Sequence, residues 1–333
     1  MNAILRCLAL LALWLAASPA HAGSYQYIRT GNTNDSQAIP TPGTALMGGG
    51  RDLDEAFRWL CDKGNGGDFL ILRASGTDAY NAYVNGLCEL NSVATLIISD
   101  KRAAQNPAVA EIIRHASVVF IAGGDQANHI RLWKGTPMQD AINANIAAGK
   151  PIGGTSAGLA VMGEFVYGAL RDAPNDKDLA SADVLLNPYF ERVTLVRGFL
   201  QIPHLENLLT DSHFVTRNRM GRCLGFLARI LQDGWSKSPQ ALAIDERTAV
   251  LVEPDGKATV AGTGKGAYFL RPTLPPETCR VGEPLTFRHI SVYRIPAGGR
   301  FDLASWTGTG GTAYSLSVEK GEVDSTQPNH AIY

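Results

Sequence analysis

The sequence predicts an α/β fold in which helices cover both faces of a mainly parallel sheet. Its first half contains four short apolar runs, at residues 44–47, 69–72, 94–98 and 118–121. Segments long enough for helices separate the runs, and each run is continuous rather than alternating, which is typical of parallel strands buried on both sides. A three-layer sandwich is the architecture that satisfies this pattern.

The remaining elements follow from local spacing and composition. A helix is expected at 52–61, because apolar residues recur there at helical intervals. Further helices are expected at 107–115 and 138–148, and further strands at 151–152, within 241–252, at 258–261 and at 267–270.

The last part of the chain changes in character. Its final 60 residues or so are rich in Gly, Pro and Thr and do not repeat the strand–helix alternation. The expected organisation is a signal peptide at 1–22, an α/β domain at 23–270 and a β-rich or irregular extension at 271–333.

Composition excludes several classes of protein. The chain has 333 residues, of which 45% are hydrophobic and 18% charged, so it can build a packed core and is not intrinsically disordered. Its 30 basic and 31 acidic side chains give a formal net charge of −1. That balance provides no field to draw the chain onto nucleic acid or an anionic membrane, so neither is expected as a partner.

The first 22 residues are expected to be a secretory signal peptide. Arg6 precedes an apolar core at 7–17, and Ala20-His21-Ala22 is a small-x-small cleavage site. The apolar core is too short to span the hydrocarbon layer of a bilayer, which is about 30 Å thick. We therefore expect a secreted or periplasmic protein that leaves the membrane after cleavage.

Four cysteines would remain after cleavage, and none has the close spacing of a metal site, so no metal is expected. In an exported protein they allow two disulfides in three pairings, with buried free thiols as the alternative. Cys61 ends the first expected helix, and Cys88 ends a second one expected between the apolar runs 69–72 and 94–98; adjacent helices on one sheet face would bring them together. A bond between Cys223 and Cys279 would complete the set.

Glycine-rich turns follow several expected strands, at residues 48–50, 74–76, 123–126 and 153–158. In α/β sheets, ligands bind beyond the carboxyl ends of the strands. The functional site is therefore expected where these turns meet.

One of the turns has the form of a nucleophile elbow. Gly154-x-Ser156-x-Gly158 lies between a strand-like segment and the apolar run 159–162. A serine on such a strand–turn–helix is pushed into solvent, and its small neighbours let a carbonyl group approach. Ser156 is therefore the candidate nucleophile, and the alternative is a turn that only packs a helix on a sheet.

A serine nucleophile needs a base and an acid that orients the base. His204 and His213 both lie in the polar segment 203–222, downstream of the elbow. Three arginines follow His213 within nine residues, which favours a site over a solvated face. Composition alone does not choose between the two histidines.

Four motifs then occur in one order, within about residues 45–253. They are Gly123-Gly124-Asp125-Gln126, Gly153-Gly154-Thr155-Ser156-Ala157-Gly158, Asp211-x-His213-Phe214-x-x-Arg217-x-Arg219-x-Gly221-Arg222 and Ile244-Asp245-Glu246-x-Thr248-Ala249. Together they resemble the cyanophycinase branch of the S51 serine peptidases, which are relatives of the aspartyl dipeptidases. The resemblance implies a class I glutamine amidotransferase-like (flavodoxin-like) sandwich, in agreement with the strand pattern.

The resemblance implies a catalytic set. Ser156 matches the family's nucleophile, and His213 matches its general base. Glu246 matches the acid that holds the base in place, with the neighbouring Asp245 as the alternative. The resemblance implies no cofactor.

The resemblance also implies the surroundings of the catalytic set. The backbone amides of Gly124 and Ala157 match the oxyanion hole. The side chains that match the substrate pocket are Gln126, Asp211, Arg217, Arg219 and Arg222. Arginines can grip a carboxylate, and an aspartate can pair with a cationic group of the substrate.

The function implied by the resemblance is an exported serine peptidase that hydrolyses aspartyl bonds, including the β-Asp-Arg bonds of cyanophycin, through an acyl-enzyme. Ser212 stands where the family usually has glutamine, and the polar segment 171–178 looks like an insertion. The nearest alternative is an aspartyl dipeptidase acting on short acidic peptides, and the alternative from another class is a catalytically silent ligand-binding relative. The expected partner is a peptide or poly-aspartyl-arginine substrate, and a homodimer is left open.

Overall fold

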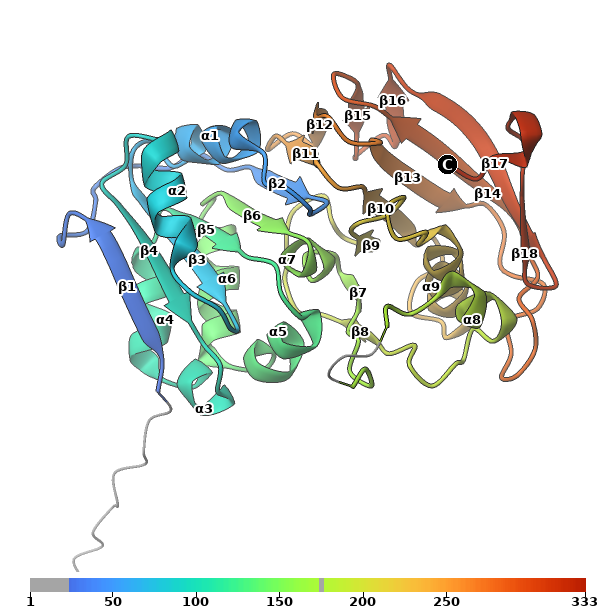
Figure 1. Ribbon diagram of the computed structural model, residues 1–333, viewed down its shortest axis with the longest axis horizontal. Coiled ribbons are helices and arrows are strands. Elements are labelled where there is room, and N and C mark those ends of the chain that lie inside the picture. The colour runs from blue at the N-terminus through green and yellow to red at the C-terminus, as the bar shows by residue number, and fades with distance from the viewer. Residues whose placement is uncertain (1–23, 174–176) are drawn as a thin grey trace, which may run out of the picture.

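Two twisted sheets lie next to each other in the structure, a computed structural model that describes residues 24–173 and 177–333. Figure 1 shows the N-terminal sheet, in blue and green, on the left and the C-terminal strands, in orange and red, on the right. The signal peptide expected at 1–22 lies outside the described residues.

The first sheet contains the parallel strands that the sequence predicts. Its strands are β1 (Gln26–Gly31), β2 (Thr44–Met47), β3 (Asp68–Arg73), β4 (Ser92–Ile97), β5 (Val118–Ile121), β6 (Ile152–Thr155), β11 (Thr248–Val252), β12 (Lys257–Gly262), β15 (Arg300–Asp302) and β16 (Thr307–Thr309). Their order is β1-β4-β3-β5-β6-β2-β11-β12-β15-β16. The central run from β4 to β2 is parallel, and antiparallel strands extend the sheet at both edges.

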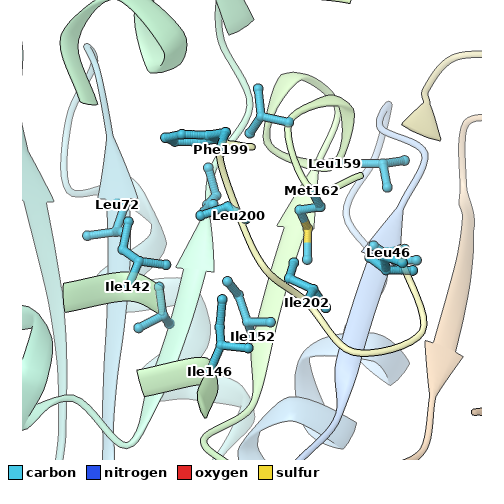
Figure 2. Close-up of a cluster of buried hydrophobic side chains, with 14 of the residues drawn as sticks. Leu46, Leu72, Ile142, Ile146, Ile152, Leu159, Met162, Phe199, Leu200 and Ile202 are labelled. Carbon is cyan, nitrogen blue, oxygen red and sulfur yellow. The ribbon is translucent and has the colours of Figure 1, made fainter. Parts of the chain in front are cut away.

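Helices cover both faces of the parallel region. On one face, α1 (Asp54–Lys63) and α2 (Ala79–Leu87) bury Phe57, Leu60 and Val84 against the sheet. The other face carries α3 (Lys101–Ala104), α4 (Pro107–His115), α5 (Gln126–Trp133) and α6 (Pro137–Ala147). Figure 2 shows part of this second layer, where Ile142 and Ile146 of α6 lie near Leu72 of β3 and Ile152 of β6.

The second sheet has the order β18-β17-β14-β13-β10-β9-β7-β8. Its strands are β7 (Phe165–Tyr167), β8 (Leu195–Arg197), β9 (Leu208–Asp211), β10 (Gln240–Ile244), β13 (Ala267–Pro272), β14 (Phe287–Ile295), β17 (Thr312–Glu319) and β18 (Glu322–Ser325). The remaining helical segments are α7 (Ala157–Ala160), α8 (Ser181–Leu186), α9 (Met220–Gln232) and the 3₁₀ turn η1 (Pro328–His330).

The two faces of the second sheet belong to different cores because side chains alternate along a strand. In β13, Tyr268 and Leu270 pack into the core that contains α9, whereas Phe269 joins the core of the first sheet. There the ring of Phe269 stacks on Phe301 of β15 with the centroids 3.7 Å apart. The strands after residue 272 therefore extend both sheets and pack them together.

The predicted α/β class with a β-rich C-terminal part is confirmed. The sequence did not predict β1 or the second sheet, and the strand region expected within 241–252 is divided between β10 and β11. These two strands belong to different sheets, so the turn between them crosses from one sheet to the other. Within the described residues, no helix combines the length and the hydropathy that a membrane span requires.

Cys61 and Cys88 form the expected disulfide. The expectation of a second bond is wrong, because Cys223 and Cys279 are free thiols, both buried. Cys279 lies near the charges of Arg229 and Asp233, at the end of α9, whereas Cys223 lies near its start. The six helical residues from Cys223 to Arg229 span about 9 Å. Cys223 is therefore separated by this distance from the end of α9 near which Cys279 lies.

We predict that a variant with both Cys61→Ser and Cys88→Ser loses about 3 kcal/mol of unfolding free energy, because the bond closes a loop across 27 residues of sequence separation. Urea denaturation of the two proteins measures the difference. Peptide mapping without reduction should recover the two cysteines in one linked fragment. Alkylation of Cys61 and Cys88 themselves, in addition to the free thiols of Cys223 and Cys279, in unreduced protein purified under oxidising conditions would contradict the prediction.

Candidate active site

The expected catalytic residues follow strands that end at neighbouring sheet edges. In the first sheet, β2 and β6 are parallel, and the amide of Ser156, directly after β6, donates to the carbonyl oxygen of Met47 at 3.1 Å. In the second sheet, β9 and β10 are parallel, and His213 and Glu246 lie just beyond their carboxyl ends. The site therefore forms where the two sheets meet.

Ser156 lies on a strained turn. Its φ of 55° and ψ of −117° are values that residues with a side chain rarely adopt. The next turn of chain is packed tightly, since a Cβ on Gly158 would lie 2.0 Å from the carbonyl oxygen of Ile121 in β5. The predicted elbow is therefore present, although α7 has only four residues and the apolar run 159–162 does not continue as a helix.

His213 lies against the turn after β2. Its amide donates to the carbonyl oxygen of Gly48 at 2.8 Å, and its Nε2 accepts from Ser156 Oγ at 2.7 Å. A Cβ on Gly49 would lie 2.5 Å from His213 Cε1 and 2.6 Å from Nε2. Only glycine at position 49 leaves space for the ring in this position.

His204, the other candidate base, lies elsewhere. Its Nε2 is 3.0 Å from the carbonyl oxygen of Pro254, on the loop between β11 and β12. The structure thus brings His213, and not His204, to the serine.

Glu246 contacts the histidine from the opposite side. Nδ1 of His213 donates to Glu246 Oε1 at 2.6 Å, and the turn is held by Arg247, whose amide donates to the carbonyl oxygen of Gly49 at 2.9 Å. Asp245 faces away and accepts the amides of Val215 and Thr216 with Oδ1, at 3.0 and 2.8 Å. Asp245 therefore anchors the loop that follows the histidine.

These contacts form a continuous path for a proton. With its proton on Nδ1, His213 has Nε2 free to accept from the hydroxyl of Ser156. Burial lowers the pKa of His213 from its ordinary 6.5, the hydrogen bond to Glu246 raises it, and the charge of Arg217 lowers it further. The net shift is downward, which keeps the imidazole neutral and able to act as a base near neutral pH.

The expected oxyanion amides border the serine. A Cβ on Gly123 would lie 3.3 Å from Ser156 Cβ, so the turn that contains Gly124 is packed against the elbow. Ala157 is the first residue of α7, and its amide therefore has no acceptor within the helix. The roles of Gly124 and Ala157 as donors to an oxyanion stay predictions.

The five side chains expected in the substrate pocket fall into two groups. Gln126 is half-buried, with Nε2 at 3.4 Å from the carbonyl oxygen of Tyr167, and Arg217 is exposed. Asp211, Arg219 and Arg222 are at most 5% exposed and are bound to one another by hydrogen bonds. Direct contact of these three with a substrate stays a prediction.

Two features of the site were not assigned a role from the sequence. The sequence predicts that the glycine turn at 48–50 borders the site, but not that it makes room for two of the side chains. A Cβ at Gly50 would lie 2.9 Å from Glu246 Oε2, just as one at Gly49 would meet His213. The run of three glycines at a strand's end was the available signal. Asp178, which binds Arg219, lies in the polar segment 171–178, and nothing in that segment distinguished it.

The described part of the chain contains no cluster of side chains suited to binding a metal ion. Among residues 24–173 and 177–333, no group of three or more His, Cys, Asp or Glu side chains could hold a metal ion.

Comparison with known proteins identifies relatives that are named cyanophycinases. The chain is 28% identical over 218 residues to a cyanophycinase of Trichormus variabilis, covering 63% of this chain and 65% of that protein. It is 30% identical over 223 residues to a cyanophycinase of Synechococcus elongatus, covering 64% of this chain and 61% of that protein. The chain thus spans less than two thirds of the length of these relatives.

A crystal structure of a peptidase from an acI-B1 Actinobacterium superposes with a TM-score of 0.47 and 21% identity, over 69% of this chain and 90% of that one. The family model described as Peptidase family S51 matches residues 73–259, which is more than half of the 333 residues and includes Ser156, His213 and Glu246. On the strength of that match, the chain belongs to peptidase family S51.

Proposed function

We propose that the protein is a serine-type peptidase of the cyanophycinase type that hydrolyses peptide bonds next to aspartyl residues. The observation that carries the proposal is the unbroken path from Ser156 Oγ to His213 Nε2, at 2.7 Å, and from His213 Nδ1 to Glu246, at 2.6 Å. A ligand-binding protein has no need of all three groups in this geometry, which argues against a catalytically silent relative.

The reaction proceeds in two halves. Ser156 Oγ attacks the scissile carbonyl carbon while His213 Nε2 takes the hydroxyl proton, and the amides of Gly124 and Ala157 stabilise the oxyanion. His213 then gives the proton to the leaving amine as the C–N bond breaks, which leaves an acyl-enzyme. Water, deprotonated by the same imidazole, releases the acid and restores the serine.

The substrate is proposed from charge and from the relatives. Arg217 is exposed beside the base, and its charge lowers the pKa of His213, so a carboxylate of the substrate could bind within reach of both. The similar proteins are named cyanophycinases, which supports the β-Asp-Arg bonds of cyanophycin as substrate. Short acidic peptides are the second candidate, because Ser212 provides a shorter arm than the glutamine usual in the family.

Export is part of the proposal. The first 22 residues have the composition of a signal peptide, and a disulfide such as Cys61–Cys88 is maintained in oxidising compartments.

Digestion of purified cyanophycin and of a panel of Asp-containing dipeptides, compared side by side, separates the two candidate substrates.

Ser156→Ala should fold normally and lose at least about a thousandfold in turnover, because it removes the attacking oxygen while leaving the turn in place. A fluorophosphonate probe followed by peptide mapping should label wild type at Ser156 alone. The matched control for labelling is Ser212→Ala, which removes a hydroxyl of the expected substrate pocket that has no part in the relay and should therefore still be labelled at Ser156. Labelling of the Ser156→Ala variant at another residue, or activity equal to wild type, would contradict the assignment.

Glu246→Gln should lower kcat/KM by about 10²–10⁴-fold, because the amide keeps the shape of the side chain but cannot stabilise the imidazolium. The base is active when unprotonated, so kcat/KM rises as the pH rises through the pKa of His213, which lies below 6.5 in wild type. Since the hydrogen bond to Glu246 raises that pKa, the acid limb of the variant should move to lower pH. The profile of kcat/KM against pH measures both effects.

Asp245→Asn is the matched control for that variant. Its oxygen can still accept the two loop amides, so a smaller loss of activity is expected, and mainly a loss of stability. If Asp245→Asn abolished activity and Glu246→Gln did not, the acid of the relay would be Asp245.

A further inference from the structure

The carboxylate of Asp178 is bound where an acidic ligand would be bound. Its Oδ2 accepts from Nε and Nη2 of Arg219 at 2.9 and 2.7 Å, and its Oδ1 accepts from Nη2 at 2.8 Å and from Nη1 of Arg222 at 3.5 Å. This two-oxygen contact is the way in which a guanidinium binds a free carboxylate.

Every side-chain nitrogen of Arg219 already donates a hydrogen bond while Asp178 is bound. The third nitrogen of Arg219 donates to the carbonyl oxygen of Ser212 at 2.8 Å and to Asp211 at 3.3 Å. Arg222 holds Asp211 with Nε and Nη2 at 2.9 and 2.5 Å. A substrate carboxylate could therefore reach Arg219 only by replacing Asp178.

The charges of the network balance only with Asp178 in it. Arg219 and Arg222 supply two positive charges, and Asp178 and Asp211 supply two negative ones. Without Asp178, a buried guanidinium would lack a counterion, which is unfavourable unless another anion takes its place. Burial would raise the pKa of Asp178, but the two arginines outweigh it and hold that pKa below its ordinary value, so the side chain is an anion at neutral pH.

Asp178 is also the one member that solvent can reach. Its side chain is 39% exposed, against 6% for Arg219, 1% for Arg222 and 4% for Asp211. An anion from solvent can therefore exchange with Asp178, whereas Asp211 is fixed in the interior.

The network lies beside the catalytic base. Arg219 binds the backbone of Ser212, the residue before His213, and its charge lowers the pKa of His213. The guanidinium of Arg222 stacks over the ring of Tyr167 at 5.3 Å, and the backbone of Tyr167 accepts from Gln126, two residues beyond the expected oxyanion turn. A carboxylate on Arg219 would thus be bound by a side chain that also holds the backbone next to the catalytic base.

We propose that Asp178 is an internal competitor for the carboxylate of an acidic substrate: it occupies Arg219 in the free protein and gives way to the substrate's carboxylate on binding. This inference rests on the proposed function and deepens it, because it makes Asp178 the residue that sets the affinity for acidic substrates. The exchange forms and breaks no covalent bond.

The test is the binding of succinate by isothermal titration calorimetry at neutral pH and low salt, in otherwise intact protein. Asp178→Asn removes the competing charge in a side chain of the same shape, so succinate should bind at least about tenfold more tightly than to wild type. Asp178→Glu restores the charge and should bind succinate as weakly as wild type. The uncharged analogue succinamide should not distinguish the three proteins.

Asp172→Asn is the matched control, since Asp172 lies in the same segment but binds Arg192 and Tyr167 instead of the arginine pair. It should leave succinate affinity unchanged. If Asp178→Asn is destabilised, succinate should raise its Tm by more than it raises the Tm of wild type, and succinamide should not.

Equal or weaker succinate binding by Asp178→Asn, or equal tightening by Asp172→Asn, would overturn the inference. The proposed function is tested separately by fluorophosphonate labelling of Ser156 in the same preparations. Labelling with unchanged succinate affinity would reject the role of Asp178 alone, and absence of labelling in wild type would reject the serine peptidase.

Discussion

The absence of a side chain at Gly49 is the constraint on which the site depends. The imidazole of His213 lies so close to this backbone that a Cβ would be 2.5 Å from the ring, and the flanking carbonyl groups of Gly48 and Gly49 accept the amides of His213 and Arg247. The turn after β2 thus positions His213 directly and positions Glu246 through its neighbour Arg247. Ser156 is fixed to the same strand through its amide, so the positions of all three groups of the proposed relay depend on β2.

This turn has to join two sheets. Ser156 follows a strand of the first sheet, His213 follows a strand of the second, and Glu246 lies in the turn that crosses between them. A relay with contacts of 2.6 to 2.7 Å tolerates little relative movement of its supports. The stacking of Phe269 on Phe301, far along the chain from the site, is one of the contacts that keep the sheets together. The C-terminal strands therefore support the site without contributing a residue to it.

The sequence predicted what depends on local pattern. Continuous apolar runs predicted the parallel strands, and the elbow pattern indicated Ser156. The resemblance to the S51 peptidases, and not the local pattern, selected His213 and Glu246, which the fold brings to Ser156. It did not predict that the region 241–252 would divide between two sheets, because strand pairing is decided by long-range packing that one sequence does not display. Nor did it reveal that Asp178 balances Arg219, since an aspartate in a polar segment is ordinarily solvated. Residues whose role depends on a distant charge or on a missing Cβ leave little local signal.

The most direct test of this account is the rate at which a fluorophosphonate labels Ser156 in Gly49→Ala. The matched control is Gly86→Ala, because a Cβ on Gly86 in α2 would meet nothing within 4 Å. Gly49→Ala should fold with the Cys61–Cys88 bond intact but be labelled at least about a hundredfold more slowly than wild type, since the added methyl displaces the imidazole from the serine. Gly86→Ala should be labelled at the wild-type rate. Equal labelling rates for Gly49→Ala and wild type would show that the relay does not depend on this turn.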